Sequence, residues 1–490
     1  MGQSKHLGAA TLSLAGFTVE VRQLFLLAIP IMLTQVVQRL ITTSDTFMLA
    51  SYDANALAAV SLAQSPYLTL LFFSSGISAA VGVFVAQRVG ADRVDEDDVA
   101  LSTGMGLWVG FGVGLPFAIA LQFTEPFLLA IGQDVELAAA SGSYARIFTP
   151  VLPLAICYGV LTQFAIAAGR PRVPLCVIAV AALANVIGNY ALIFGNFGFP
   201  ELGLQGAAIA SFVTQALAFA VLALVVTNYA PLKRFKVLAR FLAPNLQRLR
   251  EVLAVGIPIS LTIVLEVAFF TGGTLLMGYF GAAALAGHQI VMTIAATTFI
   301  VPASIATAAG VRVGQAKGDS SPEGVWTAGI TSIILGACIM AVVAVVFVLF
   351  RQPIIGLFID ESGPENAAVL QMGMALLLFA AAYQVFDAVQ ATASGSLRGV
   401  KDTAVPMKLA AISFWLIGCP AALLLGFGFN LGAYGVWGAF VIALFAAAAL
   451  LLHRFLKIIP AAVPDNVEAL EEFPAFKTKL GDAAPAANQG

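Results

Sequence analysis

Long apolar segments follow one another through almost the whole chain, separated by short links that contain charged residues, glycine or proline. A helix needs about 20 consecutive apolar residues to cross the hydrocarbon core of a bilayer, and these segments reach or exceed that length. Of the residues, 60% are hydrophobic and only 10% are charged, whereas soluble domains carry about 25% charged residues. The sequence therefore predicts an all-α polytopic membrane protein with twelve transmembrane helices. The predicted spans are 24–50, 57–87, 98–123, 137–168, 173–195, 203–230, 251–279, 284–315, 323–350, 366–397, 404–427 and 431–456.

Basic residues are distributed unevenly among the links between these spans. Lysine and arginine follow the even-numbered spans, whereas the odd-numbered links carry almost none, with Arg351 as the exception. Cytoplasmic loops carry an excess of Lys and Arg, so both termini and the central link are predicted to be cytoplasmic. The basic residues in question are Arg88 and Arg93 after the second span, Arg170 and Arg172 after the fourth, Lys233, Arg234, Lys236, Arg240, Arg248 and Arg250 after the sixth, Lys317 after the eighth, Arg398 and Lys401 after the tenth, and Arg454 and Lys457 after the twelfth.

The two halves of the chain repeat each other. When the sequence is shifted by 228 residues, "IPIMLTQVV" at 29 lies on "IPISLTIVL" at 257, and residues 29–90 match at 20 of 62 positions without a gap. Shared apolar composition would not keep Gly82, Gln87 and Gly90 in register with their counterparts. Six spans per half is an even number, so the halves are predicted to share one orientation and to be related by a pseudo-twofold axis along the membrane normal. The predicted parts are a cytoplasmic N-terminus 1–23, an N-lobe 24–230, a basic cytoplasmic linker 231–250, a C-lobe 251–456 and a cytoplasmic tail 457–490.

Three acidic residues, Asp45, Glu266 and Asp387, fall deep within predicted spans. A charge at the centre of a bilayer costs about 2.5–3.5 kcal/mol on insertion scales, so such residues are usually functional. A buried carboxylate can exchange a proton or a small cation as its surroundings change. The alternative for Asp45 is a helix-end carboxylate near the headgroups.

Tyr383 and Asp387 are four residues apart and therefore share one helical face, which Gln390 and Ser394 continue. A polar face on an apolar helix is expected to look toward a cavity or another helix. The phenol can donate to the carboxylate, or both oxygens can surround a cation; a pair that only fixes packing is the alternative. Oxygen ligands suit hard cations such as sodium, so a cation held between these two oxygens is one of the arrangements that the pair predicts.

Other polar residues of the spans have more than one interpretation. The 228-residue shift places Gln38 opposite Glu266, and Asn185 and Asn189 share a face of the fifth span. Two amides in an apolar helix either bind helices together or form part of a site. Arg39, about 100° around the helix from Gln38, can face a carboxylate, extend toward the interface or bind an anionic group. His288 is predicted to be a hydrogen-bonded structural residue.

Enzyme motifs are absent from the sequence. It contains no Walker A sequence, no HExxH, no GxSxG and no Cys or His spacing typical of a metal site. The protein is therefore not expected to be an enzyme or an ATPase, and energy for transport is expected to come from an ion gradient.

Several stretches resemble the multidrug and toxic compound extrusion (MATE) family, within it the bacterial NorM-type branch. "SDTFMLA" at 44 resembles the family's Asp-Thr motif at the end of the first helix. Further resembling stretches are "NYALIFGNFGFPELGLQGAAIAS" at 189, "ALAGHQI" at 284 and "SLRGVKDTAVPM" at 396. Together with the duplicated six-helix plan, the resemblance covers about residues 20–456.

The resemblance implies a V-shaped carrier in the bacterial inner membrane, with two six-helix lobes around a central cavity. It implies export of bulky, often cationic or amphipathic compounds by alternating access, in exchange for entering sodium ions or protons. Small molecules and membrane lipid are the expected partners of a monomer, with no nucleic acid and no cofactor beyond the coupling ion. The implied cation-coupling residues are Glu266, Tyr383 and Asp387 in the C-lobe, and Asp45, Asn185 and Asn189 in the N-lobe. The residues expected at the substrate cavity are Gln38, Phe269, Phe270, Gln289 and Phe386.

Three rival interpretations remain. A lipid-linked oligosaccharide flippase of the same superfamily should line its cavity with several basic residues, whereas Arg39 is the only deep one in the sequence. A twelve-span facilitator of the major superfamily should carry a basic signature after the second span, where "VGADRVDEDD" is acidic. A non-transporting membrane scaffold or receptor would leave the three intramembrane acids unexplained.

Overall fold

The structure is a computed structural model that describes residues 14–241, 243–360, 363 and 366–458. Its described part contains helices and no strand, and twelve helical segments are long and apolar enough to cross a membrane. The predicted fold class is therefore confirmed. The helices are α1 (Leu14–Tyr52), α2 (Ala54–Val89), α3 (Glu96–Ala120), α4 (Thr124–Ala130), α5 (Val135–Phe148), α6 (Leu152–Ala167), α7 (Arg172–Phe194), α8 (Gly203–Asn228), α9 (Ala230–Lys233), α10 (Val237–Phe241), α11 (Leu246–Met277), α12 (Ala282–Thr298), α13 (Ile300–Gly318), α14 (Pro322–Leu349), α15 (Arg351–Gly356), α16 (Ala367–Gly399), α17 (Ala404–Ala411), α18 (Cys419–Leu423) and α19 (Gly432–Ile458). Most of the predicted cytoplasmic N-terminus and tail lies outside the described residues.

Many polar residues of the links cap the helices that follow them. The Asp53 side chain accepts from the backbone N–H of Asn55 at 3.0 Å, and the Asn245 side chain accepts from that of Arg248 at 2.9 Å. Ser321 accepts from the backbone N–H of Gly324 in the same way. A side-chain cap of this kind stabilises a helix by about 0.5–2 kcal/mol, which explains why the short links are polar.

The first helix begins ten residues before the predicted span, at Leu14 instead of 24. The predicted span left out the charged residues Glu20 and Arg22, but both lie inside the helix, and Glu20 is buried. Both of its carboxylate oxygens accept from the Arg312 guanidinium at 2.8 Å. A buried charge is tolerated there because it is paired and hydrogen-bonded.

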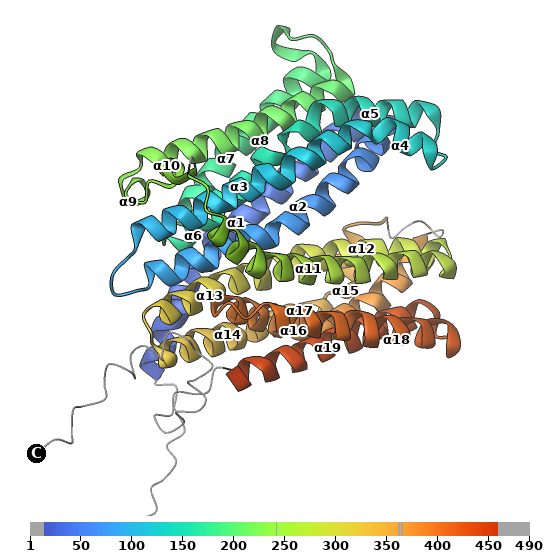
Figure 1. Cartoon of the computed structure of the whole chain (residues 1–490). Helices are drawn as coiled ribbons and strands as arrows, with labels where there is room; N and C mark the ends of the chain where they lie inside the picture. Colours follow the sequence, from blue (N-terminus) through green and yellow to red (C-terminus); the bar gives the residue numbers. More distant parts are fainter. Residues whose placement is uncertain (1–13, 242, 361–362, 364–365, 459–490) are drawn as a thin grey trace, which may run out of the picture.

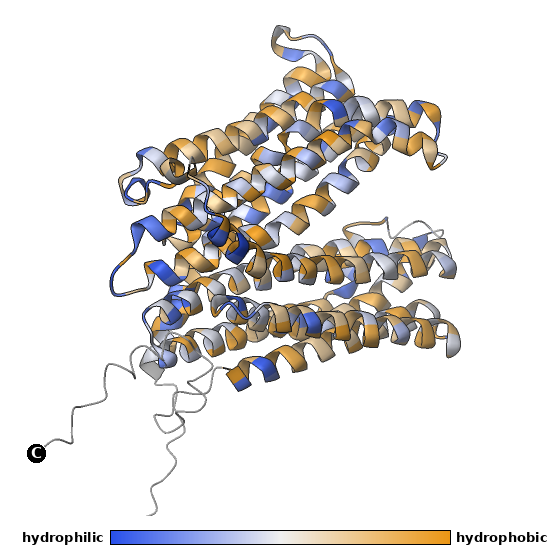
Figure 2. Cartoon of the chain, viewed as in Figure 1, coloured by the Kyte–Doolittle hydropathy of each residue, from blue (hydrophilic) through white to orange (hydrophobic). Residues whose placement is uncertain are grey.

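The helices form two bundles, the N-bundle α1–α8 and the C-bundle α11–α19, with α9 and α10 in the connection (Figure 1). The bundles lie close together at one end of the helices and diverge toward the other. The near end, here called the basic end, carries the links after the even-numbered spans. Figure 2 shows hydrophilic residues gathered most densely there, while the helices are largely hydrophobic along their lengths.

Reciprocal contacts between the two repeats join the bundles near the basic end. A Cβ added to Gly90 would overlap the backbone of Gln315, and a Cβ added to Gly318 would overlap that of Gln87. These four residues are two pairs related by the 228-residue shift, so the contact is of the isologous kind that a twofold axis produces. Close backbone approach at both positions gives a physical reason for glycine there.

Candidate functional site

A cavity of about 1170 Å³ lies between the bundles, with walls from α1, α2, α7 and α8 on one side and α11, α12, α13 and α16 on the other. All three intramembrane acids line it or lie at its wall: Asp45 from α1, Glu266 from α11 and Asp387 from α16. The other charged residues of its lining are Arg39 and Arg398. The structure therefore brings together side chains that lie up to 359 residues apart in the sequence, from Arg39 to Arg398 (398 − 39 = 359).

Asp45 is the centre of a polar cluster in the N-bundle. Asn189 donates to Asp45 Oδ1 at 2.5 Å and to Asn185 Oδ1 at 3.2 Å, and Ser211 donates to Asp45 Oδ2 at 3.3 Å. Both asparagines are fully buried, and Asn189 Oδ1 has no hydrogen-bond partner in the described part of the chain. An unpaired buried oxygen costs about 1–3 kcal/mol, so this cluster presents an acceptor that a proton donor or cation can satisfy.

The predicted N-lobe set of Asp45, Asn185 and Asn189 thus lies together, although its role in coupling stays a prediction. The alternative that Asp45 is only a helix-end carboxylate does not fit these contacts with α7 and α8. Ser211 was missed, because nothing in the spacing links one serine of α8 to an acid on α1.

The C-bundle acids lie in a second cluster. Gln390 of α16 donates to Glu266 Oε2 of α11 at 3.2 Å. Asp387 is 6% exposed, and its Oδ1 is buried without a hydrogen-bond partner among the described residues. The cavity reaches both carboxylates, so Asp387 offers an oxygen free to take a ligand.

Tyr383 lies on the predicted face of α16 and lines the same cavity. Its ring is stacked at 6.1 Å on that of Trp437 and lies 6.5 Å from that of Phe270. In the described structure the phenol makes no hydrogen bond to Asp387, so the first of the two predicted arrangements is not observed. The second, in which both oxygens surround a cation, stays a prediction.

Arg398 is the functional candidate that the sequence prediction misplaced. It was counted among the basic residues after the tenth span, but α16 continues to Gly399 and Arg398 lines the cavity. Its charge and that of Glu266 influence each other electrostatically. The signal was available: Arg398 continues the polar face of α16, eleven residues beyond Asp387 and four beyond Ser394.

The five residues predicted to line the substrate cavity divide three to two. Gln38, Phe270 and Gln289 line it, whereas Phe269 and Phe386 are not among the described residues that do. Phe269 is 6% exposed and packs in the C-bundle core with its ring 5.4 Å from that of Phe440. Phe386 packs on Phe445, 5.2 Å between ring centroids. One residue step turns a helix by about 100°, which explains why these two side chains pack into the bundle and not against the cavity; their role at a substrate stays a prediction.

His288 is structural, as predicted. Trp437 Nε1 donates to its Nδ1 at 3.1 Å, and its Nε2 lies 2.8 Å from the Thr274 hydroxyl. Because the indole N–H is only a donor, Nδ1 must accept, which assigns the ring proton of the neutral imidazole to Nε2. Arg39 forms no ion pair with a described acid, which removes one of its three predicted roles.

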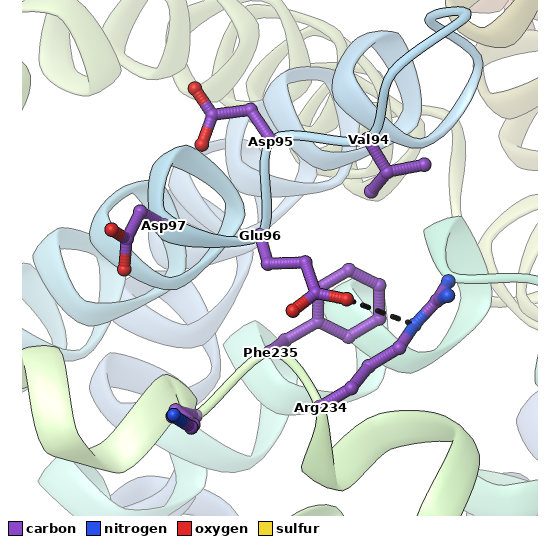
Figure 3. A pocket seen from close by; sticks show the side chains of 7 residues that line it. Val94, Asp95, Glu96, Asp97, Arg234 and Phe235 are labelled. Carbon is purple, nitrogen blue, oxygen red and sulfur yellow. Dashed lines mark ion pairs between the residues drawn. The ribbon is translucent and has the colours of Figure 1, made fainter.

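A second, smaller pocket at the basic end is lined by other residues than the central cavity (Figure 3). It is lined by residues 94–97 and 234–236, and Arg234 Nε lies 3.9 Å from Glu96 Oε1. Both side chains of this pair are about half exposed, and exposed pairs of this kind contribute about 0–1 kcal/mol. Deeper in the same end, burial and the neighbouring charges of Arg88 and Arg248 lower the pKa of Lys401 to about 8.

Two bundles of membrane-length helices around one cavity that reaches buried carboxylates define a polytopic membrane protein of the secondary-transporter class. The chain belongs to the MatE family, whose model matches residues 30–191 and 258–424. The two matches begin 228 residues apart (258 − 30 = 228), which is the shift of the internal repeat.

The chain is similar over most of its length to curated bacterial proteins. It is 39% identical over 433 residues to "Probable multidrug resistance protein NorM" of Rhizobium meliloti (strain 1021), covering 88% of this chain and 92% of the relative. To the protein of the same name from Mesorhizobium japonicum it is 37% identical over 439 residues, covering 89% and 94%. The resemblance inferred from the sequence is therefore confirmed.

Solved structures show the same fold. The eukaryotic MATE transporter AtDTX14 aligns with a TM-score of 0.79 at 22% identity, over 94% of this chain and all of that one. A structure described as the outward-facing conformation of a multidrug resistance MATE family transporter aligns with a TM-score of 0.79 at 19% identity, over 94% and 99%.

Proposed function

We propose that this protein exports bulky, often cationic or amphipathic compounds in exchange for entering sodium ions or protons, by alternating access. The observation that carries the proposal is the single large cavity whose two walls hold the carboxylate clusters of Asp45 and of Glu266 with Asp387. The relatives' printed name, a probable multidrug resistance protein, supports export of small toxic molecules.

The cavity suits large substrates. Its volume of about 1170 Å³ exceeds the usual 300–1,000 Å³ of pockets for drug-sized ligands. Apolar and aromatic residues such as Phe270 line it together with three acids and two arginines, a formal net charge of −1 when all are ionised. A cationic compound and a coupling cation therefore compete for the same carboxylates, which gives exchange a physical basis.

The proposed coupling site of the C-lobe is Glu266, Asp387 and Tyr383, and that of the N-lobe is Asp45, Asn185 and Asn189. In the described parts of the chain, no group of three or more His, Cys, Asp or Glu is arranged so that it could hold a metal ion by itself. A sodium ion would accordingly be held by a mixture of carboxylate, amide and hydroxyl oxygens, the ligands that hard cations prefer.

Contacts at the basic end support alternation between two arrangements of the bundles. Gln87 Nε2 donates to the Gly399 carbonyl at 2.8 Å, and the Glu20–Arg312 pair joins α1 to α13. We place the basic end in the cytoplasm because of its lysines and arginines, with both termini there, the lobes at 24–230 and 251–456, and the monomer in the bacterial inner membrane. Access would alternate as one lobe rocks against the other.

The rival functions have less support. A flippase for a pyrophosphate-linked lipid would need several basic side chains, but in the described lining Arg39 and Arg398 are outnumbered by three acids. A non-transporting scaffold or receptor would leave the carboxylates in both walls of the cavity unexplained.

Transport in proteoliposomes tests the proposal. An imposed inward sodium gradient is expected to drive ethidium out against its own gradient, and sodium should work at least as well as protons because the C-lobe cluster offers two carboxylates and a phenol. Dye flux followed by fluorescence is the measurement, with the gradient collapsed by an ionophore as the control. Equal flux after collapse would indicate a channel or facilitator, and absence of flux would favour the scaffold.

Topology is tested by cysteine labelling. Single cysteines at positions 93, 170, 319 and 401 are expected to react with an impermeant reagent only from the cytoplasm, and those at 54, 130 and 200 only from outside, because basic links remain inside. External labelling at 170 or 401 would contradict the two-lobe arrangement proposed for the membrane.

A further inference from the structure

Arg398 lies in the last turn of α16 and lines the central cavity from its basic end. Its guanidinium makes no ion pair or hydrogen bond with another residue in the described part of the chain, while its backbone carbonyl accepts from the N–H of Lys401 at 2.8 Å. The carboxylate with which its charge interacts is Glu266. A guanidinium cannot lose its charge in a protein, so Arg398 is a permanent cation in the cavity that Glu266 and Asp387 also line.

The other charged groups around α16 have partners elsewhere. The Lys401 ammonium lies 3.9 Å over the Phe84 ring and its charge is attracted by Asp98 and Glu251, and His288 is hydrogen-bonded on both ring nitrogens. The ion pairs nearby are Arg454 with Asp402 at 2.9 Å, Arg312 with Glu20 at 2.8 Å, and Asp98 with both Arg88 and Arg248. The charge balance of the C-bundle cluster is therefore determined by Glu266, Asp387 and Arg398.

We propose that Arg398 sets the capacity of this cluster at one monovalent cation, an inference that rests on the proposed function. Two ionised carboxylates and one guanidinium leave a net charge of −1, which one sodium ion or one proton neutralises. A second cation would leave an uncompensated positive charge in a buried site, which is strongly unfavourable. Without Arg398 the same cluster would carry −2 and would take a second cation.

The contacts of Glu266 and Asp387 differ, which assigns the two acids different roles. Glu266 accepts from Gln390 at 3.2 Å and is influenced electrostatically by Arg398, whereas Asp387 Oδ1 is buried without a partner among the described residues. Arg398 thus acts as a positioning residue whose positive charge compensates one of the two negative charges of Glu266 and Asp387. Asp387 is the oxygen donor left for the exchanging cation.

A charge-rescue experiment tests this inference. Sodium binding to the purified full-length protein is measured by equilibrium titration with radioactive sodium, in an Asp45→Asn background that removes the N-bundle acid. The background protein is expected to bind one sodium ion per chain. Arg398→Gln should bind sodium at least about tenfold more tightly and accept a second cation, since a full positive charge is removed from the same cavity. Arg398→Lys should behave as the background.

The decisive comparison uses Glu266→Gln. Alone, this change leaves the cluster neutral and should reduce sodium affinity at least about tenfold; combined with Arg398→Gln it restores −1 and should regain one bound ion. A purely structural role of Arg398 would give no rescue. Arg39→Gln, which removes a cation from another part of the same cavity, is the matched control and should not rescue.

Two results would count against the proposal in different ways. If the background protein binds sodium and Arg398→Gln changes neither the affinity nor the number of ions, and the double variant shows no rescue, this inference fails while the proposed exchange stands. If the background protein neither binds sodium nor releases protons when ethidium binds, the proposed function fails, and the inference with it.

Discussion

Replacing Asp387 by asparagine is expected to reduce cation-coupled dye efflux to near background while the protein still inserts and folds. The change keeps the shape of the side chain and removes the charge, and losing a buried charge saves about the 2.5–3.5 kcal/mol that its burial costs. Asp387 Oδ1 is buried without a partner in the described structure, so no existing hydrogen bond at that atom is lost. Drug binding should fall less than turnover, because the rest of the cavity is unchanged.

The control is the companion acid. Glu266→Gln should give the same loss, and the double change should be little worse than either single change, because members of one site are not additive. Tyr383→Phe should be milder, since it removes one oxygen and no charge. Gradient-driven efflux and sodium affinity on purified protein are the measurements. Parent-like binding and export by Asp387→Asn would make Asp387 structural and would move the search for the coupling site to Asp45.

The fold could be predicted from the sequence because a lipid bilayer restricts which backbone structures can span it. Backbone groups in a bilayer must be hydrogen-bonded within the protein, which leaves helices and closed barrels, and continuous apolar runs of this length are helices. The repeat was equally informative, because the residues preserved at the 228-residue shift, Gln87 and Gly90 with Gln315 and Gly318, are those that touch across the bundles. The boundaries were less accurate where a charged residue such as Glu20 lies inside a helix.

The acids of the site were also predictable, but their partners were not. A carboxylate in an apolar run is visible to inspection, whereas the pairing of Ser211 with Asp45 depends on how α8 packs on α1. The packing of Phe269 and Phe386 away from the cavity likewise depends on which side of each helix faces α19, a choice that tertiary packing makes. Arg398 was missed because the positive-inside rule assigned it, like the other basic residues near helix ends, to a cytoplasmic link.

Breaking the Glu20–Arg312 pair is expected to shift the protein strongly toward the arrangement in which the basic end is open. Glu20 and Arg312 form two hydrogen bonds of 2.8 Å, their side chains are 9% and 28% exposed, and they belong to different bundles. Removing one partner of a buried pair costs about 3–5 kcal/mol because it leaves a buried charge uncompensated. If the cost falls on the closed basic end alone, Glu20→Gln changes the ratio of the two arrangements by about 100-fold or more, since each 1.4 kcal/mol is a factor of ten.

The measurement is the distance between spin labels at Lys233 in the N-bundle connection and Lys457 at the end of α19, two exposed positions at the basic end, in a background without the native cysteines. Glu20→Gln should move the distribution to longer distances, and the exchanged pair Glu20→Arg with Arg312→Glu should return it toward that of the parent, because both charges are again paired. Arg22→Gln is the matched surface control, since Arg22 lies on the same helix as an exposed residue. An unchanged distribution in Glu20→Gln would mean that the glycine contacts at Gly90 and Gly318 hold the basic end closed without help from this ion pair.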